Sequence, residues 1–150
     1  MLARETLPAD RISKDIWKDR FRDIRNYERY LHNNGIVVRK FFLNVSKNEQ
    51  KKRFLERLDN PDKNWKFSAN DIKERTFWDD YMNACEDMIR HTSTKEVPWY
   101  VVPADNKWFT RIAVAAAITG TLDSLNLRYP EVRAEARAQL DAARAVLEND

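Results

Sequence analysis

The sequence predicts an α/β protein that is mostly helical, with two short parallel strands buried in its interior. Two glycines and five prolines among 150 residues favour few tight turns and much helix. Two short runs, at about 36–45 and 99–103, are apolar at nearly every position and rich in β-branched and aromatic residues. Such runs are typical of strands covered on both faces by helices, and parallel strands require a long connection like the one between them.

The first helix and the first strand follow from the spacing of apolar residues. Between Ile12 and Leu31, apolar side chains recur every three or four positions, which predicts an amphipathic helix. Gly35 is a suitable stop for that helix. The next run, from Ile36 to Val45, reads IVVRKFFLNV and is expected to form the first strand.

A helical insertion is expected between the strands. Ser46, followed by Glu49 three residues later, forms a capping box that begins a helix, and Asn60-Pro61 ends it. Ser68 is the N-cap of a second, long helix that is expected to reach about His91.

The second strand and two helices complete the chain. The run VPWYVVPA supplies the strand, and Asp105 is expected to cap a helix from about Asn106 to Leu122. Tyr129-Pro130 forms a break before a final helix over residues 131–147. Because two strands alone seldom form a stable sheet, either the helices enclose the pair or neighbouring strands complete it.

The net charge of +3 at pH 7 is modest, but basic residues concentrate in the insertion. Residues 46–75 contain nine Lys or Arg against six Asp or Glu. Two helices and their connection could therefore line a track for a polyanion, because guanidinium groups pair with phosphate oxygens in a planar fork and lysines add point charge. The candidate phosphate-binding residues are Arg53, Arg57, Lys63, Lys66 and Arg75. The alternative interpretation is an ordinary solvated face in which nearby Asp and Glu residues neutralise these charges.

A second group of candidates follows the second strand. In open α/β sheets, ligands bind beyond the carboxyl ends of the strands. Asn106, Lys107 and Arg111 follow such an end and are candidates for contacts with a nucleotide. Capping of the next helix by Asp105 is an equally good explanation of this stretch.

Several classes of function have no support in the sequence. The single cysteine, Cys85, excludes an internal disulfide and is expected to be a buried thiol on an apolar helix face. His32 and His91 have no companions at metal-binding spacing, and no nucleophilic triad or glycine-rich phosphate loop is present. No catalytic or metal-binding residue is therefore assigned. No apolar run approaches the roughly 20 residues needed to span a bilayer, so a cytoplasmic location without a membrane partner is expected.

The chain nevertheless resembles a known family over roughly residues 12–115. The matching elements are the KFFL strand, Gln50 with Lys52-Arg53-Phe54, Pro61-x-Lys63-x-Trp65-Lys66, Trp78-x-x-Tyr81, Thr92-Ser93-Thr94, Pro98-Trp99 and Asp105-Asn106-Lys107. In this fixed order they are similar to the C-terminal half of the polyphosphate kinase 2 family, whose members transfer phosphate between polyphosphate and nucleoside mono- or diphosphates.

The resemblance implies a partial P-loop kinase-like fold. Residues 1–125 would form the C-terminal half of such a domain, with a helical lid at about 46–91, and residues 126–150 would form a helical tail. The lid would hold polyphosphate through Arg53, Lys63, Lys66 and Arg75, with Arg57 a weaker candidate. Asn106, Lys107 and Arg111 are weaker candidates for contacts with the nucleotide, which would be ADP, AMP or a guanine nucleotide.

The family also has a Walker A loop and a Walker B aspartate that helps to hold Mg²⁺, and this sequence contains neither motif. The implied cofactor is Mg²⁺, with ligands outside this chain. We therefore expect a lid-bearing portion that is inactive alone and that works with a P-loop half or in a homo-oligomer. A non-catalytic module that binds polyphosphate or nucleic acid is the first alternative. A decayed fragment that associates through uncovered strands is the second.

Overall fold

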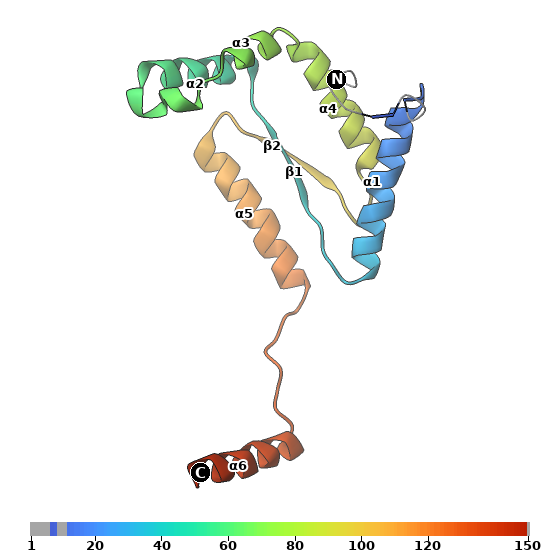
Figure 1. Ribbon diagram of the computed structural model, residues 1–150, viewed down its shortest axis with the longest axis vertical. Coiled ribbons are helices and arrows are strands. Elements are labelled where there is room, and N and C mark those ends of the chain that lie inside the picture. The colour runs from blue at the N-terminus through green and yellow to red at the C-terminus, as the bar shows by residue number, and fades with distance from the viewer. Residues whose placement is uncertain (1–6, 9–11, 150) are drawn as a thin grey trace. The chain divides into compact units, whose positions relative to one another are not determined.

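The computed structural model describes residues 7–8 and 12–149 (Figure 1). The elements, in chain order, are α1 (Ile16–Asn33), β1 (Lys40–Asn44), α2 (Lys47–Asp59), the 3₁₀ helix η3 (Pro61–Lys66), α3 (Ala69–Arg75), α4 (Trp78–Thr92), β2 (Trp99–Pro103), α5 (Lys107–Ser124) and α6 (Ala134–Glu148). The prediction of a mostly helical α/β fold with two parallel strands is confirmed. The chain divides into two compact units, Met1–Ala116 and Ala117–Asp150.

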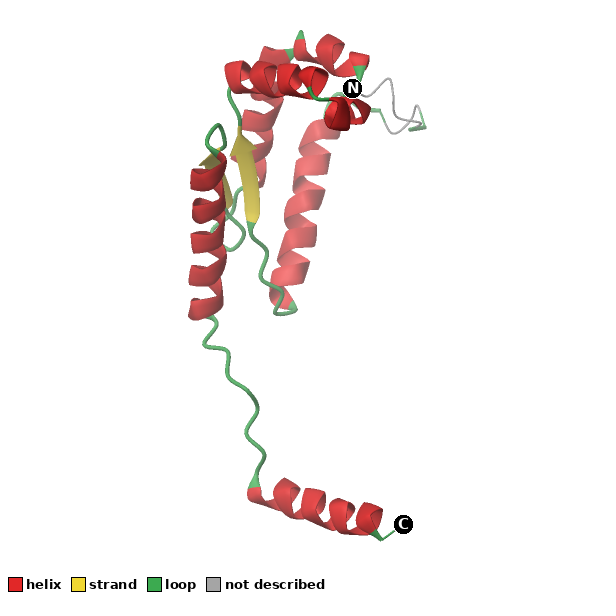
Figure 2. Ribbon diagram, turned by 90° about the vertical axis from the view of Figure 1, so that its left-hand side faces the viewer, coloured by secondary structure: helices red, strands yellow, loops and turns green. Residues whose placement is uncertain are grey.

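The two strands of the first unit pair in parallel, as predicted (Figure 2). The register places Lys40 opposite Trp99 and Asn44 opposite Pro103. The rings of Phe41 and Tyr100, which are register partners, stack with their centroids 5.3 Å apart. The first strand is shorter than expected, because pairing begins at Lys40 and the stretch from Ile36 to Arg39 has no strand assignment.

The expectation that both strands are buried requires correction. Val102 is buried, but Leu43 and Val101 are 51% and 52% exposed. A two-stranded sheet has two faces and two open edges, and the helices of the described residues do not cover all of them. Helices alone therefore do not enclose the pair.

The predicted end of the first helix is confirmed by its hydrogen bonds. Gly35 adopts a left-handed φ of +78°. Its N–H donates to the carbonyl of His32, and the N–H of Ile36 donates to the carbonyl of Leu31, both at 3.0 Å. These two bonds form a Schellman motif, which satisfies the last carbonyls of α1 and turns the chain toward β1.

The predicted boundaries of α2 are also confirmed. The hydroxyl of Ser46 accepts a hydrogen bond from the N–H of Glu49 at 3.1 Å. At the other end, the side-chain amide of Asn64 donates to the carbonyls of Arg57 and Leu58 at 2.8 and 2.9 Å. The connection that follows Asn60 forms the 3₁₀ helix η3.

The single long helix expected from Ser68 to about His91 is wrong, because the structure contains α3 and α4 instead. The N–H groups of Thr76 and Phe77 donate to the carbonyls three residues earlier, at 3.2 and 3.1 Å. The hydroxyl of Thr76 also donates to the carbonyl of Lys73 at 2.7 Å. A β-branched residue beside bulky aromatic ones has a reduced helix propensity, and its hydroxyl competes with the backbone ladder.

Helices α1 and α4 pack side by side (Figure 1). A buried polar network joins them to the sheet. The ammonium of Lys40 donates to a carboxylate oxygen of Glu28 at 2.8 Å and to the carbonyl of Thr92 at 2.7 Å. The hydroxyl of Thr92 in turn accepts from the indole N–H of Trp99 at 2.8 Å. This network fixes both strands against the ends of both helices.

Three further observations concern single features. Cys85 is half-buried, so the expectation of a fully buried thiol is only partly met. In the second unit, α6 begins at Ala134, three residues later than expected. Across the described part of the chain, no helix combines the length and the apolar character that a membrane crossing requires.

Candidate functional site

A pocket of about 170 Å³ lies where the two strands end. It is lined by Leu43, Val45, Arg53, Ala104, Lys107, Thr110 and Arg111. Leu43 belongs to β1, and Ala104 directly follows β2. The fold therefore brings Arg53, a candidate for phosphate binding, together with Lys107 and Arg111, two candidates for nucleotide binding. We call this the strand-end pocket.

Arg53 is held at the edge of the strand-end pocket by three acceptors. Its Nε donates to Glu49 at 2.9 Å. One terminal nitrogen donates to the carbonyl of Ala104 at 2.7 Å and lies 3.3 Å from that of Asp105. The side chain is 24% exposed. A guanidinium fixed in this way presents its remaining N–H groups without a large loss of rotamer freedom.

Asp105 has a different role from the expected one. Its carboxylate accepts a hydrogen bond from the backbone N–H of Ser46 at 2.7 Å, although the sequence pattern suggested that it caps α5. Hydrogen bonds from Ser46 lower the pKa of Asp105, and the charge of Arg53 acts in the same direction. Asp105 and Arg53 together tie the first two turns of α2 to the segment that follows β2.

Asn106 does not line the strand-end pocket. It is exposed, and its carbonyl accepts from the N–H of Thr110 at 3.0 Å. The hydroxyl of Thr110 lies 2.9 Å from the carbonyls of both Asn106 and Pro103. Of the three nucleotide candidates, Lys107 and Arg111 therefore face the pocket, while Asn106 shapes the start of α5.

Arg75 lines a second pocket, of about 290 Å³, between α2, α3 and α4. Its guanidinium donates to the side-chain oxygen of Gln50 at 2.5 Å and lies 5.9 Å from the ring centroid of Trp78. Phe54 belongs to the same lining. Arg75 therefore lines a different pocket from Arg53, Lys107 and Arg111.

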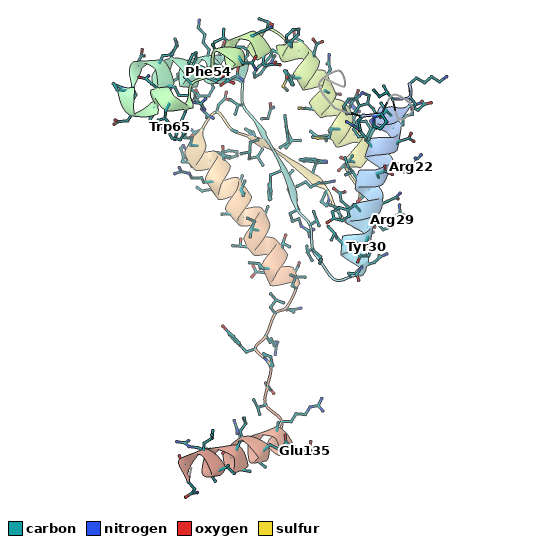
Figure 3. The ribbon with its side chains drawn as sticks, in the orientation of Figure 1. Arg22, Arg29, Tyr30, Phe54, Trp65 and Glu135 are labelled. Carbon is teal, nitrogen blue, oxygen red and sulfur yellow. The ribbon has the colours of Figure 1, made fainter. Side chains whose placement is uncertain are left out.

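The three remaining candidates for phosphate binding, Arg57, Lys63 and Lys66, line neither of these two pockets. The guanidinium of Arg57 is 5.5 Å from the ring centroid of Phe54. Lys63 and Lys66 are exposed on η3, where the ammonium of Lys66 lies 4.9 Å from the ring centroid of Trp65. Trp65 is 78% exposed (Figure 3). These residues lie on the open surface around the end of α2 and η3, which also carries the exposed Glu56, Asp59 and Asp62.

Sequence reasoning assigned no site role to Gln50 or Thr110, and it assigned Asp105 only the role of a helix cap. Gln50 is three residues before Arg53, a spacing that places the two near each other on a helix surface. Thr110 follows Asn106 by four residues, so the same periodicity would have brought it to the first turn of α5. The hydrogen bond that Ser46 donates to Asp105 had no such signal, because the two residues are 59 positions apart.

The strand-end pocket gathers side chains that can donate hydrogen bonds to an anion. Phosphate oxygens are the acceptors that match a fixed guanidinium and neighbouring ammonium groups. The family resemblance implies Mg²⁺, but among residues 7–8 and 12–149 no three His, Cys, Asp or Glu side chains lie together as a metal site. The described residues therefore do not group into a metal site of that size.

The described fold belongs to the α/β class, and Arg53, Lys107 and Arg111 gather at the carboxyl ends of its parallel strands, where open α/β sheets bind their ligands. The comparison with known families is more specific. The polyphosphate kinase 2 (PPK2) family matches residues 9–130, and the chain belongs to this family.

Three similar proteins illustrate the match. An uncharacterized protein in the chlN 3′ region of Leptolyngbya boryana is 58% identical over 135 residues, which are 90% of this chain and 99% of that protein. The ADP-polyphosphate phosphotransferase of Rhodopseudomonas palustris is 48% identical over 93% of this chain and 49% of its own length. The crystal structure of polyphosphate kinase 2 from Arthrobacter aurescens TC1 has a TM-score of 0.81 and 39% identity, over 93% of this chain and 48% of that chain.

The chain thus spans about half the length of the phosphotransferase relative and of the solved kinase. The similarity to the solved kinase agrees with the partial kinase-like fold that the sequence resemblance implied.

Proposed function

We propose that this chain forms the lid and the nucleotide-facing edge of a polyphosphate-dependent nucleotide phosphotransferase. The observation that carries the proposal is the convergence of Arg53, Lys107 and Arg111 on one pocket at the strand ends. The printed activity of the Rhodopseudomonas palustris relative supports the same chemistry. In the reaction, a terminal P–O–P bond of polyphosphate breaks, and the phosphoryl group forms a new bond to a phosphate oxygen of ADP or AMP. The reverse transfer uses the same groups.

The proposed role of these residues is to position and neutralise phosphates, because phosphoryl transfer depends mainly on alignment and charge stabilisation. Arg53 holds a phosphate beside the strand ends, and Lys107 and Arg111 bind the phosphates of the nucleotide. Arg75, in the pocket between α2, α3 and α4, and Arg57, Lys63 and Lys66, at the end of α2 and on η3, are the further cations that polyphosphate contacts in this proposal. Asn106 contributes indirectly, by shaping the start of α5.

We further propose that residues 1–150 alone do not catalyse this phosphoryl transfer. The sequence contains no glycine-rich phosphate loop, so a P-loop half supplied by another polypeptide segment or subunit must align the transferred group. A cytoplasmic location is part of the same proposal, since polyphosphate and nucleotides are its substrates.

The test is a complementation assay. The purified chain is incubated with polyphosphate, MgCl₂ and ADP, AMP or GDP, with and without the separately produced N-terminal half of the Rhodopseudomonas palustris relative. Formation of the phosphorylated nucleotide is followed by ³¹P NMR. Transfer is expected in the mixture and not with either half alone. The double variant K107Q/R111Q is expected to lower the rate at least about tenfold, since each lost ionic contact with phosphate contributes on the order of 1.5–3 kcal/mol.

The matched control is Lys51→Gln, which removes an exposed charge of α2 outside the strand-end pocket. Turnover by the 150-residue chain alone would refute the proposed dependence on a second half. Tight, salt-sensitive binding of polyphosphate without transfer in the mixture would instead favour the non-catalytic polyanion-binding module.

A further inference from the structure

A third pocket lies at the opposite ends of the strands from the proposed reaction site. It has a volume of about 460 Å³ and is lined by Arg25, Arg29, His32, Asn33, Thr94, Glu96 and Val97. The first four belong to the last turns of α1, which leads to β1, and the others belong to the loop that leads into β2. The volume falls within the range of about 300–1,000 Å³ that is usual for small-molecule sites. We call it the α1-end pocket.

Thr94 and Val97, which line the α1-end pocket, belong to a tight turn closed by hydrogen bonds within the chain. The N–H of Val97 donates to the hydroxyl oxygen of Thr94 at 3.0 Å, and the N–H of Thr94 lies 3.3 Å from the carbonyl of Val97. The side chain of Val97 is only 2% exposed. Since the hydroxyl oxygen of Thr94 accepts from Val97, its O–H remains able to donate to a bound group.

The charged side chains that line the pocket differ in whether they already have hydrogen-bond or ion-pair partners. Arg25 donates to the carbonyl of His91 at the end of α4, which fixes its position. Arg29 donates to the neutral side chain of Asn26 at 3.2 Å, and no carboxylate of the described residues pairs with it. The ring of His32 likewise has no hydrogen-bond partner within the described part of the chain. Glu96 is the single carboxylate of the lining.

Basic residues near the end of a helix often serve only to satisfy its last carbonyls and its dipole. At the end of α1 three of the last carbonyls already have partners. The carbonyls of Leu31 and His32 accept from the backbone of Ile36 and Gly35, and the carbonyl of Tyr30 accepts from the side-chain amide of Asn34 at 2.7 Å. Arg29 and His32 are therefore not required as caps and remain available for a ligand.

We propose that the α1-end pocket binds the phosphate group of a small ligand, separately from the proposed reaction site. Arg29 and His32 supply N–H donors from α1, and Thr94 supplies its hydroxyl from the facing loop. Arg25 adds positive charge at the back of the pocket. The phosphate group could belong to free inorganic phosphate or to a nucleotide, and these two sources have the same tetrahedral chemistry.

The experiment is an NMR titration of the ¹⁵N-labelled 150-residue chain at constant ionic strength. Sodium phosphate is titrated in one arm and ADP in the other, each without polyphosphate. Saturable shifts are expected at the amides of Thr94, Glu96 and Val97. A shift with phosphate identifies the free anion as a sufficient ligand, while a shift with ADP alone assigns the site to a nucleotide. Shifts confined to Lys107 and Arg111 would show binding at the strand-end pocket instead and would overturn the inference.

Three variants sharpen the result. R29Q/H32Q is expected to weaken binding at the α1-end pocket by about tenfold or more, since two donors to an anion are lost. Glu96→Gln is expected to strengthen it severalfold, because a like charge is removed. The matched control is Arg22→Gln, an exposed arginine of the same helix that pairs with Asp19 and does not line the pocket (Figure 3).

Equal affinity in R29Q/H32Q and the unmodified chain contradicts the proposal, and so does an equal loss in Arg22→Gln, which would indicate nonspecific attraction to α1. Because the readout is binding in the chain alone, it remains decisive even if the complementation assay shows no phosphoryl transfer.

Discussion

The ammonium of Lys40 lies 2.8 Å from a carboxylate oxygen of Glu28, and these side chains are only 11% and 10% exposed. Lys40 is the first residue of β1, and Glu28 lies on α1. The same ammonium donates to the carbonyl of Thr92 at the end of α4. A single buried cation thus connects the strand to two helices, and its own desolvation is offset by two strong acceptors.

The first prediction concerns the loss of one partner from this pair. Lys40→Met should lower the free energy of unfolding by about 3–5 kcal/mol, because the carboxylate of Glu28 is left buried without its partner. The double variant K40M/E28L should be more stable than K40M, since neither buried charge remains. Urea unfolding followed by circular dichroism measures both.

The exposed pair Arg90–Glu86 provides a matched control, with side chains 70% and 59% exposed. Arg90→Met should cost at most about 1 kcal/mol, the usual limit for a surface ion pair. Equal losses in K40M and R90M would mean that the buried position of Lys40 has no special effect.

The second prediction concerns Thr92, which is 1% exposed. Thr92→Val removes the hydroxyl that accepts from the indole N–H of Trp99, so the free energy of unfolding should fall by about 1–3 kcal/mol. The indole N–H of Trp99 should also exchange faster with solvent in an NMR measurement. Thr92→Ser keeps the hydroxyl and serves as the control, and it should leave this exchange slow. Slow exchange in Thr92→Val would contradict the assigned role.

The parts of the fold that could be predicted from sequence are those fixed by nearby residues. The cap at Ser46 and the stop at Gly35 were correct, because each depends on bonds within about five residues. The parallel pairing was also correct, since two apolar runs joined by a long helical segment leave few topologies. In the candidate site, Arg53, Lys107 and Arg111 were named, but their convergence required the fold.

The features that were missed depend on distant residues. Glu28 interrupts the apolar stripe of α1, and Lys40 begins an apolar strand. Neither local pattern shows that these two residues form an ion pair with each other. The exposure of Leu43 and Val101 depends on which surfaces other segments cover. The break at Thr76 was a local signal that was overlooked, because apolar periodicity continues through it.

The third prediction compares the two glycines of the chain. Gly35 has a φ of +78°, so Gly35→Ala should lower the free energy of unfolding by roughly 1–2 kcal/mol even though the added methyl group meets no atom within 4 Å. Gly120 lies within α5, and its added methyl group also meets no atom within 4 Å. Gly120→Ala should therefore have the opposite effect and raise helix stability by about 1 kcal/mol. Thermal unfolding of both variants distinguishes backbone conformation from steric crowding. A stabilising Gly35→Ala would argue against the Schellman motif.

The fourth prediction concerns pH. Because the folded protein lowers the pKa of Asp105, the bond to Ser46 should be complete above about pH 4, the ordinary range of an aspartate, and should be lost as the pH falls through the lowered pKa. The chemical shift of the Ser46 amide proton should follow this titration between pH 6 and 2. In Asp105→Asn the acceptor does not titrate, so the same amide should show no such step. An identical step in the variant would assign the titration to another group.

The fifth prediction tests whether Arg53 acts through its shape or only through its charge. Arg53→Lys keeps the positive charge, but an ammonium group cannot donate to Glu49 and Ala104 from the planar geometry that Arg53 uses. If the guanidinium positions a phosphate, the affinity for tripolyphosphate measured by calorimetry should fall about tenfold, as expected for one lost charge-assisted hydrogen bond. Arg90→Lys, at an exposed site on α4, is the control and should leave the affinity unchanged. Thermal unfolding of Arg53→Lys identifies any loss that comes from loosening of α2. If a stably folded Arg53→Lys variant binds tripolyphosphate as tightly as the unmodified chain, Arg53 contributes only its charge.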